Sequence, residues 1–278
     1  MNVEDLFFFI YAKKIGYKIV FDIVEAINIH SSGFYKRIYS KINEYCSYWG
    51  YTRSSGLFVI STHLKNELQH RYPNVPLCLL PNSNPIIERQ KKLSLNSPLK
   101  IFYSGTYASK EGIEFLIKGV IDAIKEGVKC ELYLVGKGLD ENMKFLKEIE
   151  GYSQIKYLGF VTDEKLIELM STSDVLAMTR NNSRFSNYGF PFKLTEYLST
   201  GNIVLATNVS DISIYLENRK NAFVVSPENS VEITNAIKYI VEHPKESLEI
   251  ANKGLNTMKD NFSISVVGKK FISFLNRI

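Results

Sequence analysis

Apolar runs alternate with amphipathic segments through most of this chain. Runs such as LKIFYSG, CELYLVG and DVLAMT are mostly apolar, which is typical of parallel strands that are buried on both faces of a sheet. The segments between them space their apolar residues as helices do. This alternation predicts a parallel sheet with helices on both faces. The predicted strands cover residues 99–105, 130–136, 154–159, 174–179, 202–207 and 222–226.

The pattern predicts two domains of unequal completeness. Residues 91–278 hold all six of these strands, and right-handed crossovers between parallel strands make them a doubly wound, Rossmann-like domain. Residues 1–90 hold three predicted strands, at 17–25, 56–61 and 76–82, and three strands make a poor sheet alone. The predicted fold class is therefore α/β, with one complete domain and one partial domain. Helices are predicted between the strands and over 230–242, 244–259 and 263–277.

Composition and charge restrict the function classes. The chain of 278 residues is 45% hydrophobic and 23% charged, as expected of an ordinary globular protein. Its 34 basic and 29 acidic residues give a net charge of +5, which favours anionic ligands weakly and is too small to indicate nucleic-acid binding. Cys46, Cys78 and Cys130 lie far apart in apolar contexts, so neither a disulfide nor a metal site is predicted, and a reducing cytoplasm fits best.

The sequence carries no recognisable membrane or export signal. The first segment, MNVEDLFFFIYAKKIG, has acids where a signal peptide has basic residues, and its apolar run is only about seven residues long. No other segment is predicted to span a bilayer. A cytoplasmic location is therefore predicted.

The stretch from Arg180 to Gly201 combines several features of a ligand site. Arg180 ends a predicted buried strand, and a polar Ser/Asn-rich loop follows it. Pro191 then fixes the first turn of a helix that Gly201 ends, with Lys193 and Glu196 three residues apart on one face. The N–H groups at a helix N-terminus favour a phosphate, and a carboxylate one turn further in can accept hydrogen bonds from sugar hydroxyls. The stretch predicts a site for a nucleotide diphosphate sugar at the carboxyl end of the sheet.

The same stretch resembles the donor-site signature F-P-x-K-x-x-E-Y-x-x-x-G of the GT-B glycosyltransferases of glycosyltransferase family 4, particularly bacterial polysaccharide-assembly members. In this chain the signature opens on Phe190 and Pro191, which the resemblance places in the donor site. The resemblance also implies that Arg180, Lys193 and Glu196 are the catalytic residues. The fold it implies is GT-B-like, with the complete domain binding the nucleotide sugar.

One position departs from the family pattern. Many members have two glutamates separated by seven residues, of which the second holds the nucleotide ribose and the first touches the sugar. Glu196 matches the second glutamate, and Tyr188 stands in place of the first. The resemblance therefore implies a donor-sugar contact that is made in another way.

A second motif follows the first strand of the larger domain. The segment SGTYASKEG opens the next helix as a phosphate-binding turn does. The resemblance implies donor contacts from Gly105, Thr106 and Lys110. Family members commonly have basic residues at the positions of Thr106 and Glu111. Lys110 is therefore the cation of this turn that is expected to face the leaving diphosphate.

Two further turns complete the predicted donor site. Gly136 and Gly138 end the second strand without side chains, and the resemblance implies that this turn lines the nucleotide pocket. Val161 lies in GFVTDEKL, which is similar to the family turn whose backbone contacts the base. Backbone contacts of this kind leave the identity of the base open.

The smaller domain corresponds, by the same resemblance, to the second half of the acceptor-side domain. Glu25 ends its first predicted strand and His30 lies in the polar turn that follows. Family members have residues that face the acceptor there, and both are acceptor-side candidates. A first half on the order of 100 residues would be expected for a domain of usual size. The resemblance implies either a truncated chain or a second polypeptide that supplies this half. The predicted helix 263–277 is similar to the family helix that crosses back to the first domain.

The resemblance implies a specific reaction. It is the retaining, metal-independent transfer of a sugar from a UDP- or GDP-sugar to a saccharide or lipid-linked acceptor, in the synthesis of cell-surface polysaccharide. No Asp-x-Asp metal motif occurs in the chain, and neither a metal nor another cofactor is expected. Peripheral association with the cytoplasmic face of the membrane is a further expectation.

Other interpretations of these residues stay open. The chain could bind a nucleotide sugar without turning it over, as a remnant or as one subunit of a split enzyme. Lys193 and Glu196 could form a surface ion pair, and Arg180 could be a surface arginine. Hydride transfer ranks lower, because six residues separate Gly105 from Gly112 and the spacing G-x-G-x-x-G is missing. Glycoside hydrolysis is disfavoured because the loop carries basic residues and a single acid.

Overall fold

The chain forms two compact units in a computed structural model, which describes residues 3–25, 34–87, 92–138 and 143–278. The first unit comprises residues 1–82, 187–190 and 267–278, and the second comprises residues 83–186 and 191–266. The larger unit thus holds the six predicted strands, and most of the last helix, α12 (Ile264–Leu275), belongs to the smaller unit. Each unit is described separately.

The first unit is built on a parallel sheet with the order β1-β2-β3. These strands are Val20–Ile23, Gly56–Val59 and Leu77–Leu79, and all are shorter than predicted because their pairing covers only these residues. The sheet is accompanied by α1 (Val3–Lys14), α2 (Phe34–Arg53), α3 (Thr62–Arg71) and α12.

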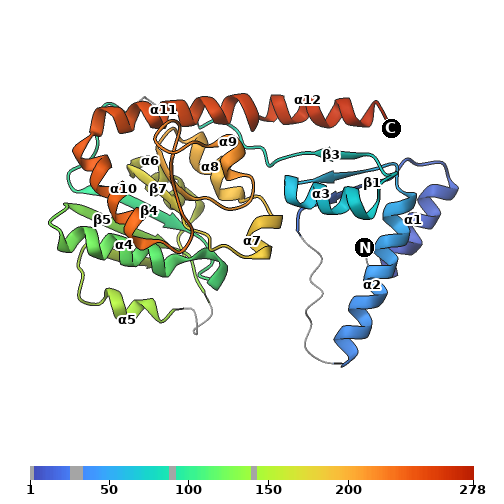
Figure 1. The fold of residues 1–278 in the computed structure, drawn as a ribbon, viewed down its shortest axis with the longest axis horizontal. Helices are drawn as coiled ribbons and strands as arrows, with labels where there is room; N and C mark the ends of the chain where they lie inside the picture. The colour runs from blue at the N-terminus through green and yellow to red at the C-terminus, as the bar shows by residue number, and fades with distance from the viewer. Residues whose placement is uncertain (1–2, 26–33, 88–91, 139–142) are drawn as a thin grey trace. The chain divides into compact units, whose positions relative to one another are not determined.

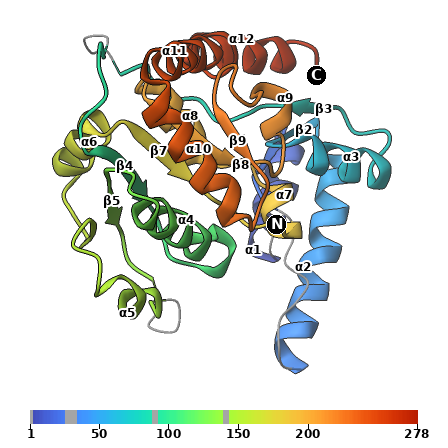
Figure 2. The ribbon, with the colours of Figure 1, turned by 60° about the vertical axis from the view of Figure 1, so that its left-hand side comes forward.

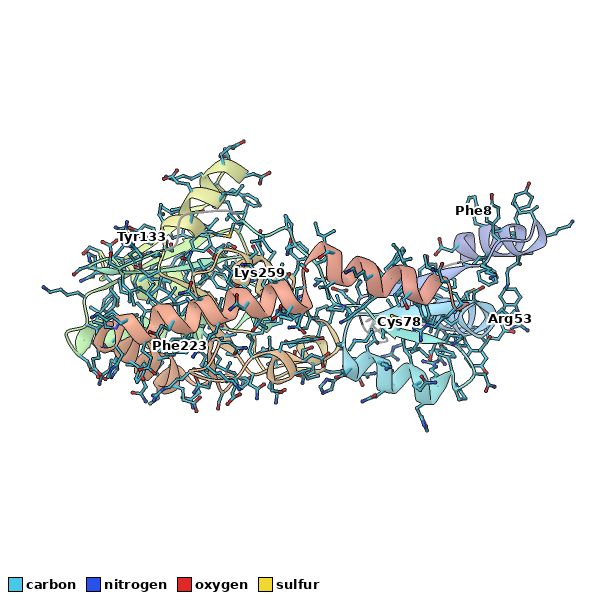
Figure 3. All side chains as sticks on the ribbon, turned by 90° about the horizontal axis from the view of Figure 1, so that it is seen from above. Phe8, Arg53, Cys78, Tyr133, Phe223 and Lys259 are labelled. Atoms are coloured by element: carbon cyan, nitrogen blue, oxygen red, sulfur yellow. The ribbon has the colours of Figure 1, made fainter. Side chains whose placement is uncertain are left out.

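Aromatic side chains fill the small core of the first unit. Phe58, on the central strand β2, lies 5.0 Å from the rings of Phe271 and Phe274 of α12. Gly56 leaves room for this packing, because a Cβ there would lie 2.6 Å from the Phe274 ring. The outer face of α1 is apolar but open to solvent, and Phe8 is 76% exposed (Figure 3).

The second unit is a doubly wound α/β domain, as predicted. Its six strands are parallel and have the order β6-β5-β4-β7-β8-β9. Counted along the chain, this is the order 3-2-1-4-5-6 of Rossmann-type sheets. The strands are Leu99–Ser104, Cys130–Val135, Ile155–Gly159, Val175–Met178, Ile203–Thr207 and Phe223–Val225 for β4 to β9.

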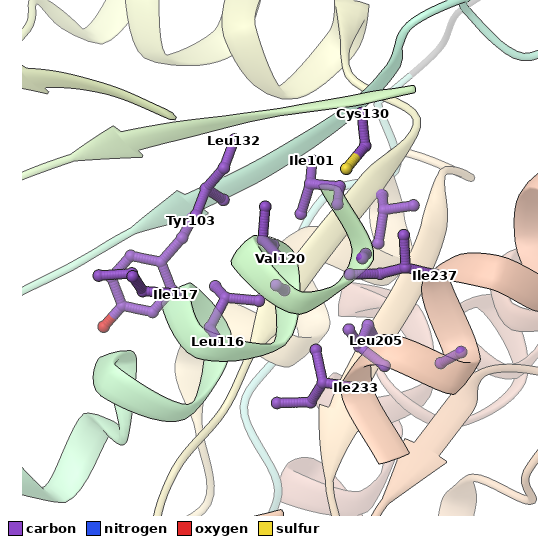
Figure 4. Packing of buried hydrophobic residues seen from close by; sticks show 14 of the residues in the cluster. Ile101, Tyr103, Leu116, Ile117, Val120, Cys130, Leu132, Leu205, Ile233 and Ile237 are labelled. Atoms are coloured by element: carbon purple, nitrogen blue, oxygen red, sulfur yellow. The ribbon is translucent and has the colours of Figure 1, made fainter. Parts of the chain in front are cut away.

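Helices cover both faces of this sheet. On one face α4 (Ile113–Lys125) and α10 (Ser230–Glu242) lie side by side (Figures 1 and 2). Their side chains pack on alternate residues of the strands, so that Val120 and Ile237 share a core with Ile101 (Figure 4). On the other face α8 (Phe192–Ser199) places the ring of Tyr197 6.5 Å from Phe102. Successive side chains of a strand point to opposite faces, which explains the two layers.

Further helices of the second unit are α5 (Phe145–Ile149), α6 (Asp163–Thr172), α9 (Ile212–Tyr215) and α11 (Pro244–Asn261). None of the helices in the described ranges is long and apolar enough to cross a membrane. Cys46, Cys78 and Cys130 are all free thiols.

The strand order changes direction between β4 and β7. After β4 the chain turns to β5 on one side, and after β7 it turns to β8 on the other. The loops at the carboxyl ends of these two strands meet here, and Asn181 donates from its backbone N–H to the carbonyl of Lys110 at 3.0 Å. In open α/β sheets this switch point is where ligands bind.

The polar loop after β7 is more ordered than predicted. The sequence predicts irregular structure from residue 181 to residue 190, but Arg184–Tyr188 forms a short helix, α7. The Oγ atom of Ser183 accepts a hydrogen bond from the backbone N–H of Ser186 at 3.1 Å. A capping serine thus stabilises the first turn.

Candidate functional site

Two cations and one carboxylate meet at the switch point of the second unit. Arg180 follows β7, Lys193 lies in the first turn of α8, and Glu111 ends the short 3₁₀ helix η1 (Ser109–Glu111) before α4. The Nζ atom of Lys193 donates to Oε2 of Glu111 at 2.6 Å. The Nε atom of Arg180 lies 3.6 Å from the other oxygen, Oε1. We call these three residues the switch-point cluster.

The switch-point cluster is largely removed from water. The side chains of Arg180 and Lys193 are 13% and 15% exposed, whereas that of Glu111 is 3% exposed. Burial lowers the pKa of the Lys193 ammonium, and Glu111 only partly offsets this effect. Burial alone would raise the pKa of Glu111, but Lys193 and Arg180 outweigh it and hold this pKa below its usual value. The carboxylate is therefore ionised beneath the two cations.

Neighbouring groups fix the position of Lys193. The Oη atom of Tyr103 lies 3.3 Å from Nζ of Lys193, and the ring centroid lies 4.5 Å from it. A Cβ on Gly105 would lie 2.5 Å from the same Nζ atom. The glycine at the end of β4 thus provides the space for the ammonium group, which is a specific reason for Gly105 in this turn.

Glu196 is separate from the switch-point cluster but interacts with it electrostatically. Burial raises the pKa of its carboxyl, and Lys193 partly offsets this rise. Within the described part of the chain, its carboxylate has no ion pair and no hydrogen bond. The simple i,i+3 ion pair between Lys193 and Glu196 is therefore not formed, because Lys193 pairs with Glu111 instead. The half-buried carboxylate is free to accept hydrogen bonds from a ligand.

Helix α8 is anchored beneath the site by Tyr197. Its hydroxyl accepts from the backbone N–H of Ser104 at 3.1 Å and lies 3.1 Å from Oγ of the same serine. Gly201 ends the helix with a φ of 66°, as the sequence predicts. Pro191 is the residue before the helix, at its N-cap.

Tyr197→Phe is expected to lower the free energy of unfolding by about 1 kcal/mol, because the partly buried N–H of Ser104 loses its partner. The measurement is chemical denaturation followed by circular dichroism. Tyr152→Phe, which changes the same group on a half-buried ring, is the control and should cost less. An equal loss in both variants would contradict the anchoring role.

The other residues that the sequence assigns to the donor site fall into two groups within the second unit. Gly136 packs directly against Gly105, since a Cβ on Gly136 would overlap the Gly105 carbonyl oxygen. A Cβ on Gly138 would lie 2.9 Å from the Cβ of Tyr107. Thr106 is exposed beside them. These three residues thus line one continuous turn region with Gly105.

Lys110 and Val161 form the second group. Lys110 precedes Glu111 in the chain and interacts electrostatically with Glu111 and Lys193. The Nζ atom of Lys110 lies 4.1 Å from the centroid of the Phe185 ring, so this cation is held over an aromatic face. Val161 is half-buried and precedes Thr162, the N-cap of α6.

Tyr188 and Phe190 belong to the first unit. The carbonyl oxygen of Tyr188 accepts from Oγ of Ser61 at 2.6 Å, and that of Phe190 accepts from Nδ2 of Asn82 at 3.3 Å. Glu25 is exposed just after β1, and His30 lies outside the described residues. The acceptor-side role of these two residues stays a prediction.

No metal-ligating cluster occurs among the residues that the structure describes, counted as three or more His, Cys, Asp or Glu side chains. Metal independence stays a prediction.

The sequence alone gives no role to Glu111 or Tyr103. Glu111 was noted only as a departure from a basic position, and an acid next to a helix N-terminus has an ordinary explanation in the helix dipole. Its partner Lys193 lies 82 residues away in the chain. No local signal could have joined the two.

Comparison with solved structures defines the class of fold. HepE from Anabaena, solved in complex with UDP and glucose, aligns with a TM-score of 0.72 and 17% identity over 99% of this chain and 76% of that chain. The pneumococcal O-GlcNAc transferase GtfA, solved with UDP and GlcNAc, aligns with a TM-score of 0.69 and 14% identity over 96% of this chain and 54% of that chain. The chain thus has the α/β fold of GT-B glycosyltransferases.

Sequence comparison gives the family. Residues 98–243 match the model of the family described as "Glycosyl transferases group 1", which is more than half of the 278 residues, and the chain belongs to this family. It is also 19% identical over 193 residues to the alpha-D-kanosaminyltransferase of Streptomyces kanamyceticus. The match covers 69% of this chain and 49% of the relative, so the chain spans about half the length of that curated protein.

Proposed function

We propose that this chain is a glycosyltransferase of family 4 that transfers a sugar from a UDP- or GDP-sugar to a saccharide or lipid-linked acceptor. The reaction retains the anomeric configuration, uses no metal, and serves the synthesis of cell-surface polysaccharide at the cytoplasmic face of the membrane. The domain assignment that goes with this function is residues 1–90 on the acceptor side and residues 91–278 on the donor side.

The observation that carries this proposal is the position of two cations at the switch point. Arg180 and Lys193 keep a small exposed surface while Glu111 is buried beneath them. Guanidinium and ammonium groups are strong partners of phosphate oxygens. The ligand class that best fits two cations at this place in a doubly wound sheet is a nucleoside diphosphate.

Related proteins support the choice of donor. HepE and GtfA were both solved with UDP, each together with a sugar, and the name of the curated relative describes transfer of a sugar. Family membership adds the reaction type.

In the proposed mechanism, Arg180 and Lys193 stabilise the negative charge that develops on the departing diphosphate. Glu196 accepts hydrogen bonds from the ribose hydroxyls, for which its half-buried carboxylate is available. The acceptor hydroxyl approaches the anomeric carbon from the same face as the leaving group, as retention requires.

Titration calorimetry with UDP and with GDP tests the donor class. Wild type is expected to bind one of them, and Arg180→Ala is expected to weaken that binding by about tenfold or more, since a charge-assisted hydrogen bond is lost. Arg53→Ala, on the exposed surface of α2, is the matched control. Failure of wild type to bind either nucleotide would reject the proposal.

The second candidate function is nucleotide-sugar binding without turnover. It is favoured by the small sheet of the first unit, which has three strands. Incubation with UDP-glucose or GDP-mannose and a mixture of saccharide acceptors separates the two. Binding with no released nucleoside diphosphate would favour this candidate.

The pH dependence of donor binding tests the role of Glu196. Because burial raises the pKa of this carboxyl above the usual 4.5, it takes up its proton at a higher pH than an exposed glutamate. The affinity for UDP-glucose, whose phosphates carry no group titrating near pH 6, is expected to fall on acidification while the pH is still above 4.5. Glu196→Gln should bind UDP-glucose more weakly than wild type at neutral pH, and its affinity should not fall on acidification in this range. An equal fall of affinity on acidification in wild type and in Glu196→Gln would contradict the proposed role of Glu196.

A further inference from the structure

Glu111 has an unusual place for an acid in a site that is proposed to hold a diphosphate. Its carboxylate contacts the two cations that are assigned to the phosphates, Lys193 at 2.6 Å and Arg180 at 3.6 Å. It is also the least exposed of the three side chains, at 3%. An incoming anion can therefore reach the cations from the solvent side while Glu111 stays behind them.

The backbone around Glu111 holds the carboxylate in place. Its carbonyl accepts from Oγ1 of Thr179 at 3.2 Å, and its N–H donates to the carbonyl of Ala108 at 2.9 Å. The next residue, Gly112, has a φ of 58°, and a Cβ there would overlap the Thr179 carbonyl oxygen. The segment is thus tied to the end of β7, and the carboxylate is a fixed part of the switch-point cluster.

The charge of the cluster follows from its members. Arg180 and Lys193 contribute two positive charges and Glu111 contributes one negative charge, which leaves +1. Without Glu111 the same two cations would present +2. In a partly buried site a change of one unit charge at a few ångströms alters the binding of an anion strongly.

We infer that Glu111 is a fixed counter-charge that weakens the hold of the site on the released nucleoside diphosphate relative to the intact sugar donor. The inference rests on the proposed function. A free diphosphate carries about one negative charge more than its sugar ester, because its terminal phosphate loses a second proton near pH 6. A cluster of charge +1 attracts that additional negative charge less strongly than a cluster of charge +2 would. Glu111 thereby favours product release over product retention.

A purely positioning role for Glu111 predicts the opposite sign. If the carboxylate served only to hold Lys193 in its binding orientation, its removal would weaken the binding of every phosphate ligand. If it acts as a counter-charge, its removal tightens binding, and tightens it most for the ligand with the most negative charge.

The test is titration calorimetry at about pH 8, where a terminal phosphate is fully ionised, with inorganic pyrophosphate, UDP and UDP-glucose. Glu111→Gln is expected to bind pyrophosphate and UDP about tenfold more tightly than wild type, and UDP-glucose by a smaller factor. Glu114→Gln removes the same charge from an exposed residue in the first turn of α4 and is expected to change none of these affinities by more than about twofold.

Two further variants keep the test decisive. Glu111→Met removes the charge with an unbranched apolar side chain and is expected to behave as Glu111→Gln does, so either one that folds is sufficient. Glu111→Gln combined with Lys193→Met restores the cluster charge to +1 and is expected to bind pyrophosphate no more tightly than wild type.

The outcomes separate this inference from the proposed function. Unchanged, weaker or undetectable pyrophosphate binding in Glu111→Gln overturns the counter-charge role, as does equal tightening of UDP and UDP-glucose. Failure of wild type to bind UDP and GDP rejects the proposed donor site, whatever the pyrophosphate comparison shows.

Discussion

Replacement of Lys193 by methionine is expected to weaken the binding of UDP or GDP by about 100-fold, which corresponds to about 2.7 kcal/mol. Two effects add in this variant. The diphosphate loses a charge-assisted hydrogen bond, which alone contributes about 1.5–3 kcal/mol. The carboxylate of Glu111 then lacks its closest cation, at 2.6 Å in the wild type, and repels the incoming phosphates.

The comparison that isolates this effect uses Lys165→Met. Lys165 is an exposed lysine of the same unit, paired with Glu168 on α6, and its loss is expected to change nucleotide affinity by less than about twofold. Titration calorimetry of both variants gives the result. A Lys193→Met protein that binds as tightly as wild type would show that the switch-point cluster does not hold the phosphates.

Folding of the variant can be checked independently of binding. A buried carboxylate that loses its cation is costly, on the order of 3 kcal/mol, so Lys193→Met is expected to unfold at lower denaturant concentration. The double variant with Glu111→Gln removes both charges and is expected to regain most of this stability. Loss of affinity that persists in the stable double variant is then due to the missing ammonium and not to misfolding.

The fold of the second unit was predictable because most residues of its strands are apolar. All six strands begin and end within one residue of their predicted positions. A strand that is buried on both faces contains few polar residues, so the polar residues on either side of it mark where it begins and ends. In the first unit the strands are shorter than predicted, because apolar residues such as Tyr17 and Val24 lie beyond the paired segment and are exposed.

The candidate site was predictable where its residues are close in sequence, and not where they are distant. Arg180, Lys193 and Glu196 lie within one stretch of sequence, and their order along a strand, loop and helix indicated a ligand site. The sequence also assigns Lys110 to this site; its ammonium lies over the Phe185 ring, and its contact with the ligand stays a prediction. The pairing of Lys193 with Glu111 depends on the spatial meeting of two loops that only the strand order brings together.

The two glycines beneath the site connect the sheet to the proposed chemistry. Gly105 and Gly136 end the neighbouring strands β4 and β5, and the Gly105 N–H donates to the carbonyl of Val135 at 3.0 Å. Gly136 has a φ of 122°, which a residue with a side chain rarely adopts. The close approach of the two backbones gives Lys193 its place beside Gly105. A side chain at either glycine would therefore disturb both the sheet and the cation.

Gly136→Ala is expected to lower the free energy of unfolding of the second unit by about 4 kcal/mol. The strained backbone contributes about 1–3 kcal/mol, and the overlap of the new Cβ with the Gly105 carbonyl oxygen contributes a similar amount. Denaturation should be followed by circular dichroism, because the single tryptophan of the chain, Trp49, lies in the first unit.

Two other glycines of the same unit separate the two contributions to this loss. Gly127 has a φ of 86°, but a Cβ there would meet no atom within 4 Å, so Gly127→Ala is expected to cost only the backbone strain, about 1–2 kcal/mol. Gly151 has open space and no positive φ, and Gly151→Ala should change stability by less than about 0.5 kcal/mol. If Gly136→Ala cost no more than Gly127→Ala, the two strand ends would have to move apart freely. A turn that moves so easily could not hold Lys193 in the fixed position from which its contact with the diphosphate is argued.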